Sequence, residues 1–258
     1  MRRGAQLVAR ADPFALRAPG RHSFALCVSE TAPIAMKKLL ASLFALTGAA
    51  LGAQAQQKPQ VIDPKSILFT TPTLSDDVAP LVPATGQPSV GELVFHEDDW
   101  SQVEFFPKTQ LSNIQRLLTE YKGFEQAQRV KHGWKNVYVR KIQRVPVLAG
   151  ARPVAQLEAV LGAKAGAAPL LLSSGAVSGR VKDGFSLPLG GNVTLYGYVA
   201  GDGVPVLGAS IGSNPDDMKL TQAFTKLSAS HSLVLVDWRA QLVLVSVGKD
   251  GRIEAWRP

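Results

Sequence analysis

Short apolar runs crowd the second half of the chain, and turn-forming residues such as Gly, Pro, Asn and Asp bound most of them. Runs of this length and composition are typical of β-strands. Gly201-Asp202-Gly203 separates two of them and predicts a hairpin turn. We expect strands at eight positions, the last three forming a C-terminal antiparallel meander: 170–173, 177–182, 185–187, 193–200, 204–211, 233–237, 242–247 and 252–256.

Helical periodicity, with apolar residues three or four positions apart, predicts helices in three places. The longest helix is expected to start near Thr109 and to continue to Phe124, and a short one covers 154–161. The third is expected to begin at Asn214-Pro215-Asp216-Asp217, because Asn caps helices, Pro suits the first turn and acidic side chains favour the positive end of the helix dipole. Its apolar face contains Met218, Leu220, Phe224 and Leu227.

The segment 91–148 predicts the element order β-β-α-β. Strands at 92–96 and 100–106 are expected to pair as a hairpin around the polar turn 97–99, and one or two strands follow the helix within 134–147. The hairpin and the helix each have one apolar face. We therefore expect four residues to pack together: Phe95, Phe105, Leu118 and Tyr121.

These patterns together predict an α+β fold with predominantly antiparallel sheets and two main helices packed on one side. The element order is β-β-α-β, followed by a β-rich region, a helix and three strands. The two parts, 91–148 and 149–258, form either separate units or one continuous domain, 91–258. Residues 56–90 contain six prolines and are expected to form an extended linker, because Pro removes a backbone donor and favours an extended predecessor.

A pattern in three parts begins at Met36. Met36-Lys37-Lys38 carries positive charge, an uncharged run of 13 residues follows at 39–51, and Ala53-Gln54-Ala55 places small residues at a cleavage site. This order is typical of a secretory signal peptide, here 36–55. The apolar run is shorter than the ~20 residues that cross a bilayer. We therefore expect cleavage near Ala55, a periplasmic or secreted protein, and no transmembrane span in the mature chain.

Residues 1–35 precede this signal peptide and contain five Arg, three Pro and no sustained periodicity. We interpret them as a mis-called upstream extension that stays disordered. Without residues 1–55 the net charge falls from +8 to +3, because residues 56–258 contain 21 Lys and Arg against 18 Asp and Glu. This small excess argues against a nucleic-acid partner. Cys27, the single cysteine, is lost as well, so the mature chain is expected to be disulfide-free.

Gly208-Ala209-Ser210-Ile211-Gly212 matches the Gly-x-Ser-x-Gly pattern, in which a nucleophilic serine lies between a strand and a helix. With His231 and Asp237 as partners, it gives an alternative hypothesis, a periplasmic serine hydrolase. Two observations argue against it. The predicted helix starts only at Asn214, and His231 precedes Asp237, the reverse of the order in α/β-hydrolases. The sequence therefore favours a non-enzymatic protein, and we expect no cofactor because the chain contains no nucleotide-binding motif.

His96-Glu97-Asp98-Asp99 places four metal-ligand types in one turn. Successive residues of an extended chain point to opposite faces, so these side chains are not expected to converge on one ion. We interpret the segment as a solvated hairpin tip and expect no metal site.

The segment 129–144 contains six basic residues and no acidic one: Arg129, Lys131, Lys135, Arg140, Lys141 and Arg144. Trp134 and Tyr138 lie among them, and a combination of basic and aromatic side chains suits an anionic partner. The alternative is a solvated sheet face on which long side chains cover apolar surface. The candidate binding residues are Lys131, Trp134, Lys135, Tyr138 and Arg140.

The predicted export and the basic segment together indicate a binding or accessory protein of the bacterial cell envelope. The expected partner is an anionic envelope component or a partner protein. Nucleic acid is not expected, because an exported protein rarely meets it.

We expect the exported protein to begin at Gln56, because signal peptidases cut after small-x-small sites such as Ala53-Gln54-Ala55. N-terminal sequencing of periplasmic or secreted material measures this directly. An intact Met1 terminus in a cytosolic fraction would contradict the prediction.

Overall fold

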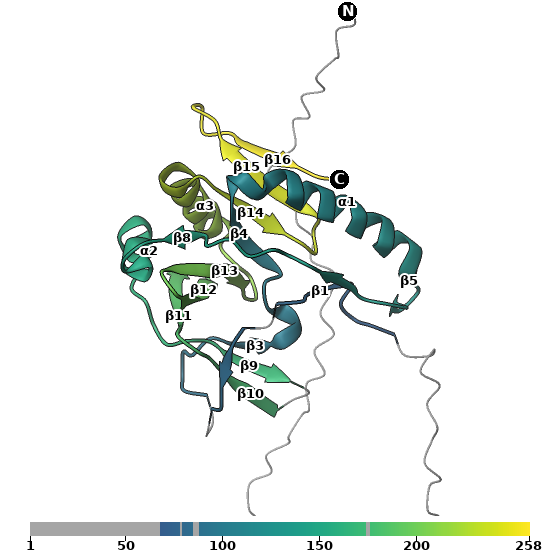
Figure 1. The fold of residues 1–258 in the computed structure, drawn as a ribbon, viewed down its shortest axis with the longest axis horizontal. Helices are drawn as coiled ribbons and strands as arrows, with labels where there is room; N and C mark the ends of the chain where they lie inside the picture. The colour runs from purple at the N-terminus through teal and green to yellow at the C-terminus, as the bar shows by residue number, and fades with distance from the viewer. Residues whose placement is uncertain (1–67, 78, 85–87, 174–175) are drawn as a thin grey trace, which may run out of the picture. The chain divides into compact units, whose positions relative to one another are not determined.

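The computed structural model describes residues 68–77, 79–84, 88–173 and 176–258 (Figure 1). The predicted upstream extension, the signal peptide with its cleavage site, and the first part of the Pro-rich segment lie outside these residues. The described part of the chain contains three α-helices and sheets that are mostly antiparallel, which confirms the α+β class. No helix in that part is both long and apolar enough to cross a membrane.

One antiparallel sheet of eight strands dominates the described residues (Figure 1). Strand β4 is paired on both of its edges, with β13 and with β14, although β13 and β14 lie far from it in the sequence. Both predicted parts of the chain therefore contribute to the same sheet. The strands in order are β11 (Gly184–Gly190), β12 (Val193–Ala200), β13 (Gly203–Ile211), β4 (Val103–Pro107), β14 (Leu233–Asp237), β15 (Leu242–Val247) and β16 (Ile253–Trp256), with β8 (Leu148–Ala149) beside the start of β13.

The predicted hairpin between 92–96 and 100–106 is wrong. Strand β3 (Val94–His96) pairs in parallel with β9 (Leu170–Ser173), whereas β4 joins the large sheet. Between them lie a short 3-10 turn and Ser101, whose φ of 54° turns the chain into the left-handed region. This turn sends the two strands into different sheets instead of pairing them.

The described residues also form three smaller sheets. The sheet with four strands has the order β2 (Leu81–Val82), β10 (Ala176–Val181), β9 and β3. The other two sheets have two strands each. They are β1 (Thr73–Ser75) parallel to β7 (Tyr138–Arg140), and β5 (Arg129–Val130) antiparallel to β6 (Gly133–Trp134). Both β1 and β2 lie within the segment 56–90 that was expected to be an extended linker.

The expectation that the two main helices pack on the same side of the sheet is wrong. Both faces of β14 are apolar, and a helix packs against each of them. Leu233 and Leu235 belong to the core cluster that contains residues of α2 (Pro153–Leu161) and α3 (Asp217–His231). Val234 and Val236 point the other way, into the cluster formed with α1 (Leu111–Gln128). The helices α1 and α3 therefore cover opposite faces of the large sheet.

The four residues expected to pack together are divided among three core clusters. Leu118 and Tyr121 are on the buried face of α1, and Phe105 lies on the α2 and α3 side of the sheet. Phe95 packs against the third cluster, between the large sheet and the four-stranded one. Neighbouring residues of a strand point to opposite faces, so the side chain of Phe106, and not that of Phe105, packs against α1.

Several predicted elements agree closely with the structure. The expected ranges 193–200, 233–237 and 242–247 coincide with β12, β14 and β15, and the C-terminal meander is confirmed. The third helix starts later than expected. Asp216 is its cap and accepts a hydrogen bond from the Met218 backbone at 3.0 Å, because Asn214 has a φ of 50° and lies outside the helix.

Leu118→Ala should lower the free energy of unfolding by about 2–5 kcal/mol, because Leu118 is fully buried and the substitution leaves a cavity. Urea-induced unfolding followed by circular dichroism measures the change. The matched control is Val139→Ala at a side chain that is 45% exposed, which should change stability by less than about 0.5 kcal/mol. Equal midpoints for the two variants would contradict the assigned core.

Candidate functional site

Ser210 and His231 lie beyond opposite ends of β4. In the ladders, Gly208 of β13 is opposite Glu104, near the start of β4, and Leu233 of β14 is opposite Pro107, at its end. The five residues of β4 span about 16 Å at 3.3 Å per residue. Helix α3, which leads from one end to the other, is 15 residues and about 22 Å long. A hydrogen bond between the two side chains is therefore excluded.

The serine also lacks the local geometry of a nucleophile elbow. Ser210 lies within β13, paired with Thr194, and its backbone is not in the left-handed region. Asp237 accepts a hydrogen bond from the Ala240 backbone at 2.8 Å, and burial raises the pKa of Asp237. It closes the turn after β14. The serine-hydrolase hypothesis built on Ser210, His231 and Asp237 is wrong on this geometry.

Arg140 was expected on an exposed basic face, and this expectation is wrong. Its side chain is fully buried among residues that are distant in the sequence. The guanidinium donates to the Thr73 hydroxyl and to the Ser101 carbonyl, each at 3.0 Å, and lies 5.0 Å from the ring centre of Trp238. Burial lowers the pKa of Arg140 to about 10, against the influence of Glu104, so the group stays charged at neutral pH.

The Arg144 side chain also points to the interior, where it takes part in an ion-pair network centred on Glu104. The fully buried Glu104 accepts hydrogen bonds from Arg144 Nη1 at 2.7 Å and from Trp238 Nε1 at 3.0 Å. Arg144 Nε donates to Asp77 at 2.7 Å. The single guanidinium of Arg144 thus meets two carboxylates within one network. Its function is structural, because it connects β4, β14 and the segment after β7 to the segment after β1.

Tyr138 likewise packs against α1 instead of facing a partner. Its ring lies 5.4 Å from the rings of Tyr121 and Phe124, and its hydroxyl donates to Glu120 Oε2 at 3.3 Å. Burial and the charge of Glu120 raise the pKa of Tyr138. Binding by Tyr138 stays a prediction, but most of its contacts are to the protein's own core.

The remaining candidates form a short ribbon of three adjacent segments. Trp134 in β6 is opposite Arg129 in β5, and on its other edge it pairs with Phe69 through backbone hydrogen bonds of 2.8 and 3.0 Å. Lys131 lies in the turn between β5 and β6, and Lys135 follows β6. We call these three paired segments, with the turn and Lys135, the basic ribbon: 68–69 and 129–135.

The basic ribbon combines uncompensated charge with exposed apolar side chains. Lys131 and Lys135 are exposed, and neither forms an ion pair with any residue that the structure describes. Arg129 has one carboxylate neighbour, Glu125, at 4.0 Å. Leu68 and Phe69 are 41% and 38% exposed beside Trp134, and sequence reasoning missed them because their pairing with β6 is long-range.

The acidic turn after β3 distributes its side chains among separate partners. Asp99 binds Arg239 at 2.7 Å, Glu97 accepts from the Ser173 hydroxyl at 2.6 Å, and the Asp98 backbone donates to His96 Nδ1. Within the described ranges, no three His, Cys, Asp or Glu side chains gather as a metal site would require.

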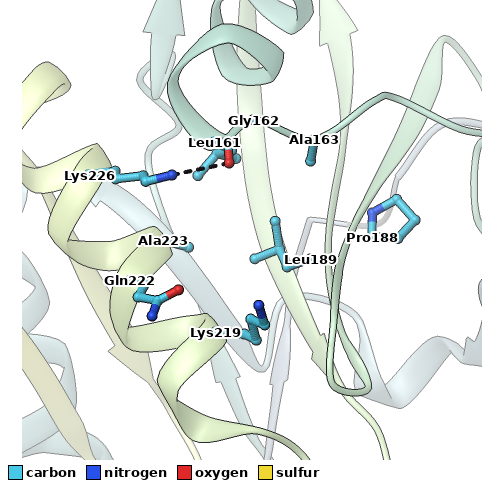
Figure 2. A pocket seen from close by; sticks show the side chains of 9 residues that line it. All are labelled: Leu161, Gly162, Ala163, Pro188, Leu189, Lys219, Gln222, Ala223 and Lys226. Carbon is cyan, nitrogen blue, oxygen red and sulfur yellow. Dashed lines mark hydrogen bonds between the residues drawn. The ribbon is translucent and has the colours of Figure 1, made fainter.

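Two cavities of about 260 Å³ each were not predicted from the sequence. One lies between α2, β11 and α3 (Figure 2), and the other lies beside the acidic turn, where Trp100 and Leu171 meet Asp77. Their lining residues come from segments far apart in the chain, so no local pattern signals them.

Comparisons with known proteins return no relative: no family model, no curated protein and no solved structure matches this chain.

Glu104→Gln should lower the free energy of unfolding by about 3–5 kcal/mol, because it removes the buried carboxylate that pairs with Arg144. The control is Glu120→Gln, which removes an exposed ion pair with Arg116 and should cost at most about 1 kcal/mol. Chemical denaturation of both variants measures the difference. A Glu104→Gln protein as stable as the control would show that the network does not stabilise the fold.

Proposed function

We propose that the protein is an exported, non-enzymatic binding protein of the bacterial envelope that attaches to an anionic lipid surface through the basic ribbon. Export rests on the signal-peptide pattern at 36–55. The binding role rests on the ribbon, and the separation of Ser210 from His231 favours binding over hydrolysis.

The observation that carries the proposal is the pair Lys131 and Lys135, exposed and without ion-pair partners among the described residues. Elsewhere in the segment 129–144, Glu104 and Asp77 neutralise Arg144 and the Arg140 side chain is buried, whereas Lys141 is exposed and has no ion pair among the described residues. The ribbon therefore keeps a local positive field. Such a field attracts an anionic surface within about one Debye length, roughly 8–10 Å at moderate salt.

Leu68, Phe69 and Trp134 favour a lipid surface over a soluble polyanion. Aromatic and aliphatic side chains next to lysines are the combination found at the membrane interface, where apolar groups enter the headgroup boundary and the ammonium groups meet phosphate. A chain of phosphates would offer the exposed Leu68 and Phe69 side chains no apolar surface to pack against. Nucleic acid fits less well because the charge excess is small.

The proposal predicts that protein purified after export binds vesicles containing phosphatidylglycerol and not vesicles of phosphatidylcholine alone. Lys131→Glu with Lys135→Glu should weaken the binding at least tenfold, because each lysine near an anionic surface contributes about 1 kcal/mol and reversal also adds repulsion. Co-sedimentation at two ionic strengths measures both effects, and added salt should weaken the wild-type binding.

The matched control is Lys182→Glu with Lys249→Glu, two exposed lysines outside the ribbon. It changes the net charge by the same amount and should leave vesicle binding almost unchanged. Equal loss in both double variants would attribute binding to net charge alone. Binding to an anionic cell-wall polymer without vesicle binding would replace the lipid with that polymer.

A further inference from the structure

The cavity between α2, β11 and α3 has a cationic wall. Figure 2 shows Lys219, Gln222 and Lys226 reaching from α3 toward the space between this helix and β11. On the other side lie the end of α2 at Leu161–Ala163 and the β11 residues Pro188 and Leu189. The residues that line the cavity include two lysines and no carboxylate.

The two lysines differ in how they are held. Lys226 Nζ donates to the Leu161 carbonyl at 3.2 Å, which fixes its ammonium at the end of α2 (Figure 2). This contact satisfies one of the helix-terminal carbonyls and suits the negative end of the α2 dipole. Lys219 forms no ion pair with any residue in the described ranges, so its charge is available to a ligand.

The frame of the cavity is tightly packed. The turn between β11 and β12 lies against the start of α3 so closely that a Cβ on Gly191 would be 2.5 Å from Asp216 Cβ and 3.4 Å from Lys219 Cγ. The close contact holds the stem of Lys219 beside the turn. On β11, the register shifts between Pro188 and Gly190, which places a bulge at Leu189, facing the cavity. Bulges of this kind re-aim side chains and are frequent next to binding sites.

We propose that this cavity binds a small organic anion, a carboxylate or phosphate ester with a short carbon chain. Its anionic group is held by Lys219 and Lys226 and accepts a hydrogen bond from the Gln222 amide. Its carbon chain lies against Leu161, Ala163 and Leu189. The volume of about 260 Å³ is just below the roughly 300–1,000 Å³ typical of drug-sized ligands, which limits the ligand to a small molecule.

The cavity belongs to different elements from the basic ribbon, so the proposal does not depend on the lipid-binding function. No residue of the ribbon lines the cavity, and Lys219 is not among the residues changed in the vesicle experiment. The two proposals can therefore fail separately.

The test titrates butyrate, and separately inorganic phosphate, into the full chain labelled with ¹⁵N, with chloride keeping the ionic strength constant. Amide resonances of Gly162, Ala163, Leu189 and Gln222 should shift and saturate. Butanol, which has the carbon chain without the charge, should give no saturation. Lys219→Gln should weaken butyrate binding by about tenfold or more, the loss expected for one charge-assisted hydrogen bond.

Lys219→Arg should keep most of the affinity, because it retains the charge, and Lys182→Gln is the control for an exposed lysine outside the cavity. Saturation by phosphate alone would assign the site to phosphate and not to carboxylates. The proposal is overturned if no anion gives saturable shifts at these residues, or if Lys219→Gln binds butyrate as tightly as the wild type. An unchanged amide spectrum outside the cavity shows that the variants are folded.

Discussion

The position of β4 between β13 and β14 is the constraint on which the rest of the structure depends. Its two edges are occupied by strands from the second half of the chain, and its two faces take part in different cores. Because Phe105 and Phe106 point to opposite faces, Glu104 points to the same face as Phe106, into the interior. A buried carboxylate needs a counter-charge and hydrogen-bond donors, and Arg144 and Trp238 provide them.

That requirement divides the basic segment into two parts with different roles. Beyond Tyr138, the backbone is held beside β1, and Arg140 and Arg144 turn inward to the polar groups around β4. Before Lys135, the chain leaves the core as the basic ribbon, where no described carboxylate neutralises Lys131 or Lys135. The same stretch of sequence therefore contributes stability at one end and, as we propose, binding at the other.

The large sheet also separates the two proposed binding sites. The ribbon is connected through β7 and α1 to one face of the sheet, whereas the cavity is formed by α2 and α3, which pack against the other face. A protein arranged in this way can attach to a surface through one site and hold a small anion in the other. The shared element is β14, whose alternating side chains pack under α1 on one face and under α3 on the other.

Local patterns were sufficient for elements whose defining interactions are short-range. The apolar runs at 193–200, 233–237 and 242–247 correspond to strands, because each pairs on at least one edge with the strand next to it in the sequence. The partners of β3 and β4, the opposite placement of α1 and α3, and the burial of Arg140 were decided only by the tertiary structure. Each depends on pairing between segments distant in the chain, and an isolated arginine in a strand has the same local pattern whether water or Thr73, Ser101 and Trp238 surround it. The cavity depends entirely on the tertiary structure, since Lys219 and Leu189 become neighbours only when α3 packs against the edge strand β11.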